Sequence, residues 1–113
     1  MAFTDKAEFN VPRHIVQKGA VNIETITADK TLTYADSTYQ ILTNSKGSEA
    51  VVTLPALKDG AHFFITCSAA SGHTIEVQDA DGGTVIGTPN LGGGKGSLIV
   101  CDGSAWAVVI EQV

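Results

Sequence analysis

Short runs rich in Val, Ile, Thr and aromatic residues, separated by turn-forming residues about every eight to twelve positions, constrain the fold of this chain most strongly. Gly, Pro, Asp, Asn and Ser supply the separators, as in Asp59-Gly60 and Asp102-Gly103. No part of the sequence shows a sustained helical periodicity. The pattern therefore predicts an all-β fold, a small antiparallel β-sandwich or β-barrel, with strands at residues 21–27, 31–34, 39–43, 50–54, 62–68, 74–77, 84–87, 97–101 and 105–110.

The last two predicted strands form the clearest local unit. They flank Asp102-Gly103-Ser104, where the glycine can adopt the positive φ of a tight hairpin turn. Because side chains alternate along a strand, Trp106, Val108 and Ile110 are expected to share one face and to anchor the core. The same rule predicts core-facing positions on two earlier strands, at Phe63, Ile65 and Cys67 and at Ile75 and Val77.

The chain divides into an N-terminal arm and a body. Its 113 residues fit one domain, with residues 1–20 predicted as an extended arm and residues 21–113 as the β-sandwich or β-barrel. The net charge of −5 separates into +1 on the arm and −6 on the body. The arm contains more large apolar residues than a solvated linker usually has, namely Phe3, Phe9, Val11, Ile15 and Val16. We expect it to become ordered either by docking on another protein or by packing on its own body as an edge strand.

Charge and hydropathy exclude several classes of partner. An acidic chain with a pI near 4.9 does not suit binding to nucleic-acid phosphates. No run approaches the roughly 18 apolar residues of a membrane helix, and acids occupy the N-terminal region where a signal peptide is apolar. We therefore expect a soluble protein without an export signal, and neither nucleic acid nor membrane as a partner.

Histidine and cysteine do not fall into a metal-binding or catalytic pattern. His14, His62 and His73 are far apart, and no pair of His or Cys residues has the short spacing of a zinc site. Cys67 and Cys101 lie in apolar strands, so we expect reduced core residues rather than a disulfide or a catalytic thiolate.

Two glycine-rich loops also have simple interpretations. In Gly92-Gly93-Gly94-Lys95-Gly96-Ser97, the lysine is followed by glycine and then by a strand, whereas a phosphate-binding loop needs Ser or Thr and a helix. Asp79 and Asp81 precede Gly82-Gly83 but lack the further ligands of a calcium loop, so we expect a solvated turn. The sequence thus predicts no cofactor, no metal and no enzymatic activity.

The order of the turn-and-strand motifs resembles a small β-module found in virion proteins of tailed bacteriophages, most closely in capsid decoration (cement) proteins. The motifs that carry the resemblance are Leu32-Thr33, Asp36-Ser37, Ile41, Val52-Thr53-Leu54-Pro55, residues 60–65, residues 72–77, Val85-Ile86-Gly87 and residues 102–108. Each motif is weak alone, and together they span roughly residues 30 to 110. The resemblance implies a non-enzymatic protomer, commonly trimeric, that is made in the host cytoplasm and sits on the capsid surface, where it stabilises the shell.

Two attachment sites follow as hypotheses. The arm is expected to contact the major capsid protein, as a strand added to a sheet edge, through Phe3, Phe9, Val11, Arg13 and Ile15. The family and the run of small residues make Leu91, Gly92, Gly93 and Gly94 the candidates for the interface of a homotrimer.

The alternative is a receptor-binding or carbohydrate-binding module of a tail fibre or head fibre. Such a module presents exposed aromatic rings, and Tyr34 and Tyr39 are the candidates because Phe63 and Trp106 are needed in the core. A small hydrolase is disfavoured, since the sequence reveals no convergent polar pocket.

Overall fold

A computed structural model of the chain describes residues 18–81, 85 and 89–112, and in these residues it contains nine strands and no helix. The all-β prediction is confirmed. The strands form a five-stranded sheet in the order β1-β3-β5-β8-β9 and a four-stranded sheet in the order β2-β4-β6-β7. Their bounds are β1 Lys18–Ile26, β2 Lys30–Thr31, β3 Ser37–Asn44, β4 Ala50–Thr53, β5 His62–Cys67, β6 Ile75–Gln78, β7 Asn90–Leu91, β8 Lys95–Cys101 and β9 Trp106–Glu111.

The first six strands alternate between the two sheets. Strands β1, β3 and β5 pair in parallel in one sheet, and β2, β4 and β6 pair in parallel in the other. Only the pairs β5–β8, β6–β7 and β8–β9 are antiparallel among the described strands. The predicted antiparallel architecture is therefore wrong, and both sheets are mixed. A turn residue bends the chain, but it does not decide whether the next strand pairs with the previous one or crosses to the other sheet.

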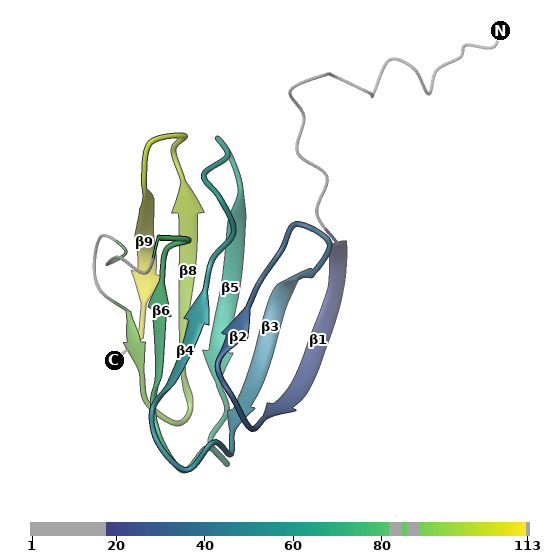
Figure 1. Cartoon of the computed structure of the whole chain (residues 1–113), viewed down its shortest axis with the longest axis vertical. Coiled ribbons are helices and arrows are strands. Elements are labelled where there is room, and N and C mark those ends of the chain that lie inside the picture. Colours follow the sequence, from purple (N-terminus) through teal and green to yellow (C-terminus); the bar gives the residue numbers. More distant parts are fainter. Residues whose placement is uncertain (1–17, 82–84, 86–88, 113) are drawn as a thin grey trace, which may run out of the picture.

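The two sheets form two layers, with β2, β4 and β6 in front of β3, β5 and β8 in Figure 1. In the described residues the larger sheet ends at β1 and β9 and the smaller one at β2 and β7, so neither sheet closes on itself. The barrel alternative is thus wrong. Lys18 begins β1, three positions before the predicted strand start, and lies at an edge of the larger sheet.

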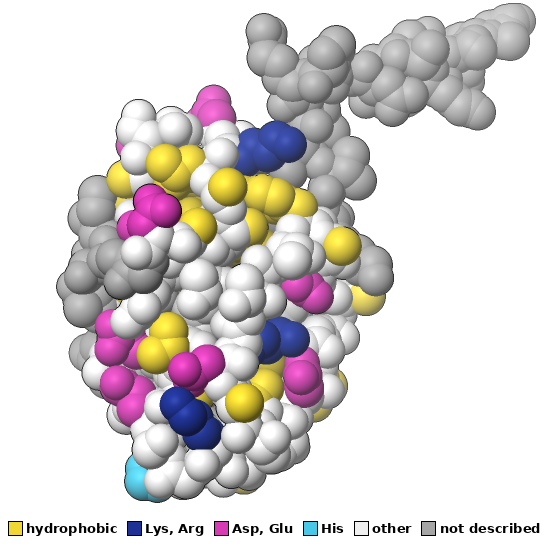
Figure 2. Space-filling model, viewed as in Figure 1, with side chains coloured by type: hydrophobic (Ala, Val, Ile, Leu, Met, Phe, Trp, Pro, Cys, Tyr) yellow, Lys and Arg dark blue, Asp and Glu magenta, His cyan; other side chains and the backbone are white. Residues whose placement is uncertain are grey.

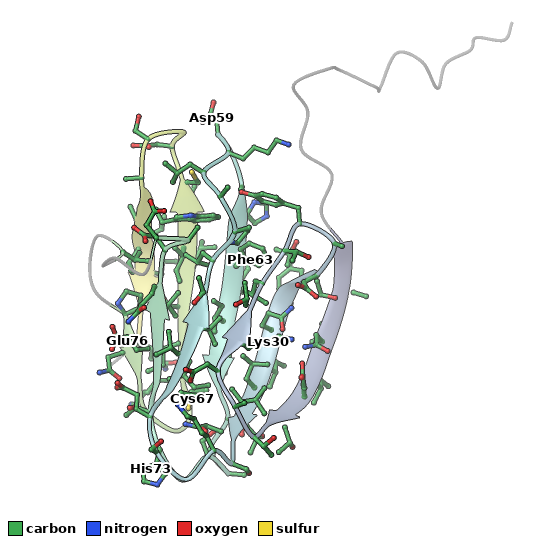
Figure 3. The ribbon with its side chains drawn as sticks, in the orientation of Figure 1. Lys30, Asp59, Phe63, Cys67, His73 and Glu76 are labelled. Atoms are coloured by element: carbon green, nitrogen blue, oxygen red, sulfur yellow. The ribbon has the colours of Figure 1, made fainter. Side chains whose placement is uncertain are left out.

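The core lies between the layers, and the alternation within single strands predicts most of it. Phe63, Ile65 and Cys67 are all fully buried on β5. The rings of Phe63 and Trp106 lie 6.0 Å apart between centroids, and the Trp106 indole N–H donates to the Pro55 carbonyl at 3.2 Å. Figure 3 marks Phe63 and Cys67 on β5, with Asp59 and His73 at opposite ends of the body. Ile75 and Val77 are also buried, as predicted.

The β8–β9 hairpin is confirmed, with one error in the predicted core. Gly103 adopts a φ of 94°, and the Asp102 carboxylate accepts hydrogen bonds from the backbone N–H groups of Ser104 and Ala105. The pairing register shifts between Leu98 and Ile99, so that Val108 faces Ile99 whereas Ile110 faces Leu98. Ile110 is therefore 63% exposed instead of buried. The predicted strand at residues 84–87 lies outside the described residues except Val85, which is buried.

The buried side chain of Asn44, the last residue of β3, links two loops of the body. The Asn44 side chain is 1% exposed, and its amide nitrogen donates to the carbonyls of Ser48 at 3.0 Å and Thr74 at 2.9 Å. Its amide oxygen accepts from the Lys46 backbone N–H at 2.8 Å. The loops that precede β4 and β6 are therefore both fastened to β3 by a single side chain.

Candidate interaction surfaces

The predicted arm contacts cannot be placed, because Phe3, Phe9, Val11, Arg13 and Ile15 lie outside the described residues. What the structure places is the point of attachment. Residues 18–20, which the sequence assigned to the arm, belong to β1. The segment before them therefore joins the body at β1, which is a terminal strand of the five-stranded sheet in the described residues.

The predicted oligomer segment, Leu91 to Gly94, divides between core and surface. Leu91 is fully buried, while Gly93 and Gly94 are exposed in the turn between β7 and β8. A Cβ on Gly93 would lie 3.5 to 3.7 Å from the carbonyl oxygens of Ser68, Ala69 and Ser71. These are ordinary van der Waals distances, so the packing within one chain does not require glycine at this position. The predicted role of the glycine run between chains stays a prediction.

The cysteines and histidines are dispersed in the fold. Cys67 and Cys101 are buried free thiols, as predicted, and the Cys101 sulfur accepts from the backbone N–H groups of Lys58 and Gly103. In the part of the chain that the structure describes, no three His, Cys, Asp or Glu residues gather as metal ligands do. The same residues contain no helix long and apolar enough to cross a membrane.

One hollow lies where the loops that follow β4 and β6 meet the turn between β8 and β9. It has a volume of about 350 Å³ and is lined by residues of three loops and the first residue of β9, among them Pro55, Asp79, Asp81, Ser104 and Trp106. The Asp79 carboxylate accepts from the Asp81 backbone N–H at 3.0 Å, which is the contact of a turn. This arrangement matches the solvated turn expected at these acids.

The outward side of the five-stranded sheet is the most distinctive surface. Two rows of paired residues cross it: Val21, Tyr39, Phe64, Leu98 and Ile110 in the first, and Ile23, Ile41, Thr66 and Gly96 in the second. We call these nine residues the outer face. None of them is charged, and seven carry a large apolar or aromatic side chain.

The two candidate tyrosines have different environments. Tyr34 is partly buried, with its hydroxyl donating to the Ala56 carbonyl and the Lys58 ammonium 5.6 Å from its ring centre. Burial raises the pKa of the Tyr34 hydroxyl. Tyr39 belongs to the outer face, is 40% exposed and stacks on Phe64 with ring centres 5.1 Å apart. Of the two, Tyr39 is the ring open to a ligand.

The shifted carboxylates serve the framework. A hydrogen bond from Asn22, followed by one from Lys30, lowers the pKa of Glu24, whose oxygen lies 3.0 Å from the Lys30 ammonium. Hydrogen bonds from Lys46 and from the Val51 backbone lower the pKa of Asp29. Each of these carboxylates holds a loop or a strand edge, and neither lines the hollow beside Trp106.

The sequence did not predict the outer face, although a signal was present. Tyr39 and Ile41 alternate with Gln40 and Leu42, so β3 carries large apolar residues on both of its sides. Such two-sided strands are typical of parallel sheets that are covered on both faces.

Comparison of the chain with protein-family models, with curated proteins and with solved structures finds no match in any of the three.

Proposed function

We propose that this chain is a non-enzymatic structural protein of a tailed-bacteriophage virion, which decorates and stabilises the exterior of the capsid. The observation that carries the proposal is the order of the turn-and-strand motifs between residues 30 and 110. The body that contains these motifs is a two-layered all-β fold of the sandwich type, which is consistent with the proposal. The partner is the major capsid protein. A ligand that binds only the assembled shell shifts the equilibrium away from disassembly, which is how decoration stabilises a capsid.

The arm is the attachment device in this proposal. It precedes β1, which is an edge strand of the larger sheet in the described residues. Its apolar residues Phe3, Phe9, Val11 and Ile15 fill pockets on the capsid protein while main-chain hydrogen bonds add a strand to that protein's sheet. The body is a homotrimer, and its charge of −6 stays in solvent.

The test is capsid occupancy of a chain that lacks residues 1–17, since a deletion at this point leaves β1 intact. Capsids of the phage that encodes the chain are prepared without it and incubated with full-length or shortened protein. We expect a loss of binding of at least tenfold, with the fluorescence of Trp106, the single tryptophan, unchanged. A chain with Ser at positions 3, 9, 11 and 15 should lose binding equally, whereas Lys6→Ser is the matched control. Full occupancy by the shortened chain would refute the role of the arm.

A carbohydrate-binding module of a fibre is the second candidate, and the exposed Tyr39–Phe64 stack favours it. Sugars stack on such rings. Tyr39→Ala should then abolish binding to host-surface glycans while Tyr34→Ala leaves it intact. Absence of glycan binding by the wild-type chain at millimolar concentration would remove this candidate.

A further inference from the structure

We propose that the outer face of the five-stranded sheet is the surface through which copies of this chain bind one another. Its first row is continuous across the whole sheet, because Val21 pairs with Tyr39, Tyr39 with Phe64, Phe64 with Leu98 and Leu98 with Ile110. The row therefore contains one apolar side chain from each of the five strands.

The exposed apolar side chains of the body concentrate on this face. Eight large apolar residues are exposed in the described part of the chain, and all but Leu57 and Val109 belong to the outer face. Ile23 on β1 is the most exposed at 77%, followed by Ile110 on β9 at 63%. The central aromatic pair, Tyr39 and Phe64, is about 40% exposed. Aromatic residues at the centre and no charge are the composition of an interface core.

Charge makes the outer face the part of the body where two copies can meet. The body carries −6, so two copies repel each other wherever their acidic surfaces meet. Figure 2 shows Lys, Asp and Glu side chains scattered over the side formed by β2, β4 and β6. The nine residues of the outer face include none of these, so like-charged copies can meet there without placing acid against acid.

Shape defines how the copies meet. A shallow groove of about 390 Å³ lies at the β8–β9 side of the outer face, between Phe64, Thr66, Leu98 and Ile110. Ile23 projects at the opposite side, on β1. When two of these sheets face each other about a twofold axis along β5, the β1 side of each copy meets the β8–β9 side of the other, which places each Ile23 over the groove of the second copy.

The area is sufficient for a specific contact. The outward side of the whole sheet, with five strands about 4.8 Å apart and about six residues each, covers about 24 by 20 Å, and the outer face is its apolar part. Two such faces bury about 1,000 Å², near the lower bound of a specific protein interface. This pairwise contact is distinct from the contact of the proposed trimer, and it does not require a capsid.

The first test is the mass of the full-length chain by sedimentation equilibrium between 1 and about 100 μM. We expect a discrete multiple of 11.7 kDa for the wild type. Ile23→Lys and Ile110→Lys should each raise the dissociation constant at least tenfold. Leu57→Lys is the matched control, since Leu57 is 48% exposed but lies outside the face, and it should leave the mass unchanged. A monomeric wild type, or an oligomer that persists in both face variants, would overturn the proposal.

A second test covers the case in which a charged variant fails to fold. Cysteines are introduced at Ile23 and Ile110, which lie four strands apart in one copy, about 19 Å and far beyond the reach of a disulfide. Mild oxidation should yield covalent multimers from Ile23→Cys/Ile110→Cys and only monomers from Ile23→Cys/Leu57→Cys. Monomers from both pairs would contradict the proposed contact.

The outcome is separable from that of the proposed function. Capsid occupancy of the shortened chain tests the virion role alone. A wild type that is monomeric, with face variants that lose capsid binding, would show that the outer face contacts the capsid and would overturn the contact between copies. Oligomers that form through the face but bind no capsid would leave this inference standing and remove the virion role.

Discussion

Replacing Asn44 with Ala should destabilise the body more than any other single polar substitution at the ends of the strands. The side chain is 1% exposed and makes three hydrogen bonds, to Ser48, Thr74 and Lys46. A neutral hydrogen bond contributes about 1 kcal/mol net to stability. The Thr74 carbonyl keeps its bond from the Ala50 N–H, and Ser48 is exposed enough to bind water. We therefore expect a loss of about 2 to 3 kcal/mol, slightly less than the full sum.

Urea unfolding followed through Trp106 fluorescence measures this loss. The wild type and the variant are compared at the same chain concentration, because any self-association adds to apparent stability. The slope of the transition should stay constant while its midpoint falls. Asn90→Ala is the matched control, since Asn90 is exposed on β7 and its truncation should change stability by less than about 0.5 kcal/mol. A loss below about 1 kcal/mol for Asn44→Ala, or one equal to the control, would refute the reasoning.

Three further predictions concern the pH response, the hairpin and the thiols. The pKa of Glu24 is lowered in the folded state, so its contribution to stability is present above the ordinary value of 4.5 and is lost as the pH falls through the lower folded value. Glu24→Gln should flatten the acid limb of a pH titration of stability, and an unchanged limb would contradict this. Gly103→Ala should lose about 1 to 2 kcal/mol in urea unfolding because Gly103 has a φ of 94°, whereas Gly72→Ala, with open space and no positive φ, should be nearly neutral. Cys67 and Cys101 should react with a thiol reagent only in denaturant, and rapid labelling of the folded chain would count against their burial.

Local patterns in the sequence predicted what depends on neighbouring residues. The alternation on β5 and the Asp102-Gly103 turn are consequences of strand pleating and of glycine's freedom, and both are confirmed. Ile110 shows the limit of this reasoning. A shift of one residue in the β8–β9 register reverses the direction of a side chain, and nothing in the residues of β9 alone shows that the shift occurs.

The pairing of the strands depends on distant contacts, which explains the error in sheet type. Ile23 pairs with Ile41 and Ile41 with Thr66, so β1, β3 and β5 each pair with a strand that is not the next one in the sequence. The outer face is assembled from five strands in this way. Sequence reasoning therefore assigned Ile23 and Ile41 to strands but did not bring them together as a surface.

The strand order also determines when this protein can complete its fold during synthesis on the ribosome. β5 occupies the centre of the larger sheet, yet one of its two neighbours, β8, begins only at Lys95. Until that segment leaves the exit tunnel, β5 has an unpaired edge, and Phe63 lacks the Trp106 ring. A nascent chain that stalls before β8 thus exposes a sheet edge of the kind that aggregates. Mutations late in the gene are then expected to reduce the yield of protein more than equally severe mutations in β1.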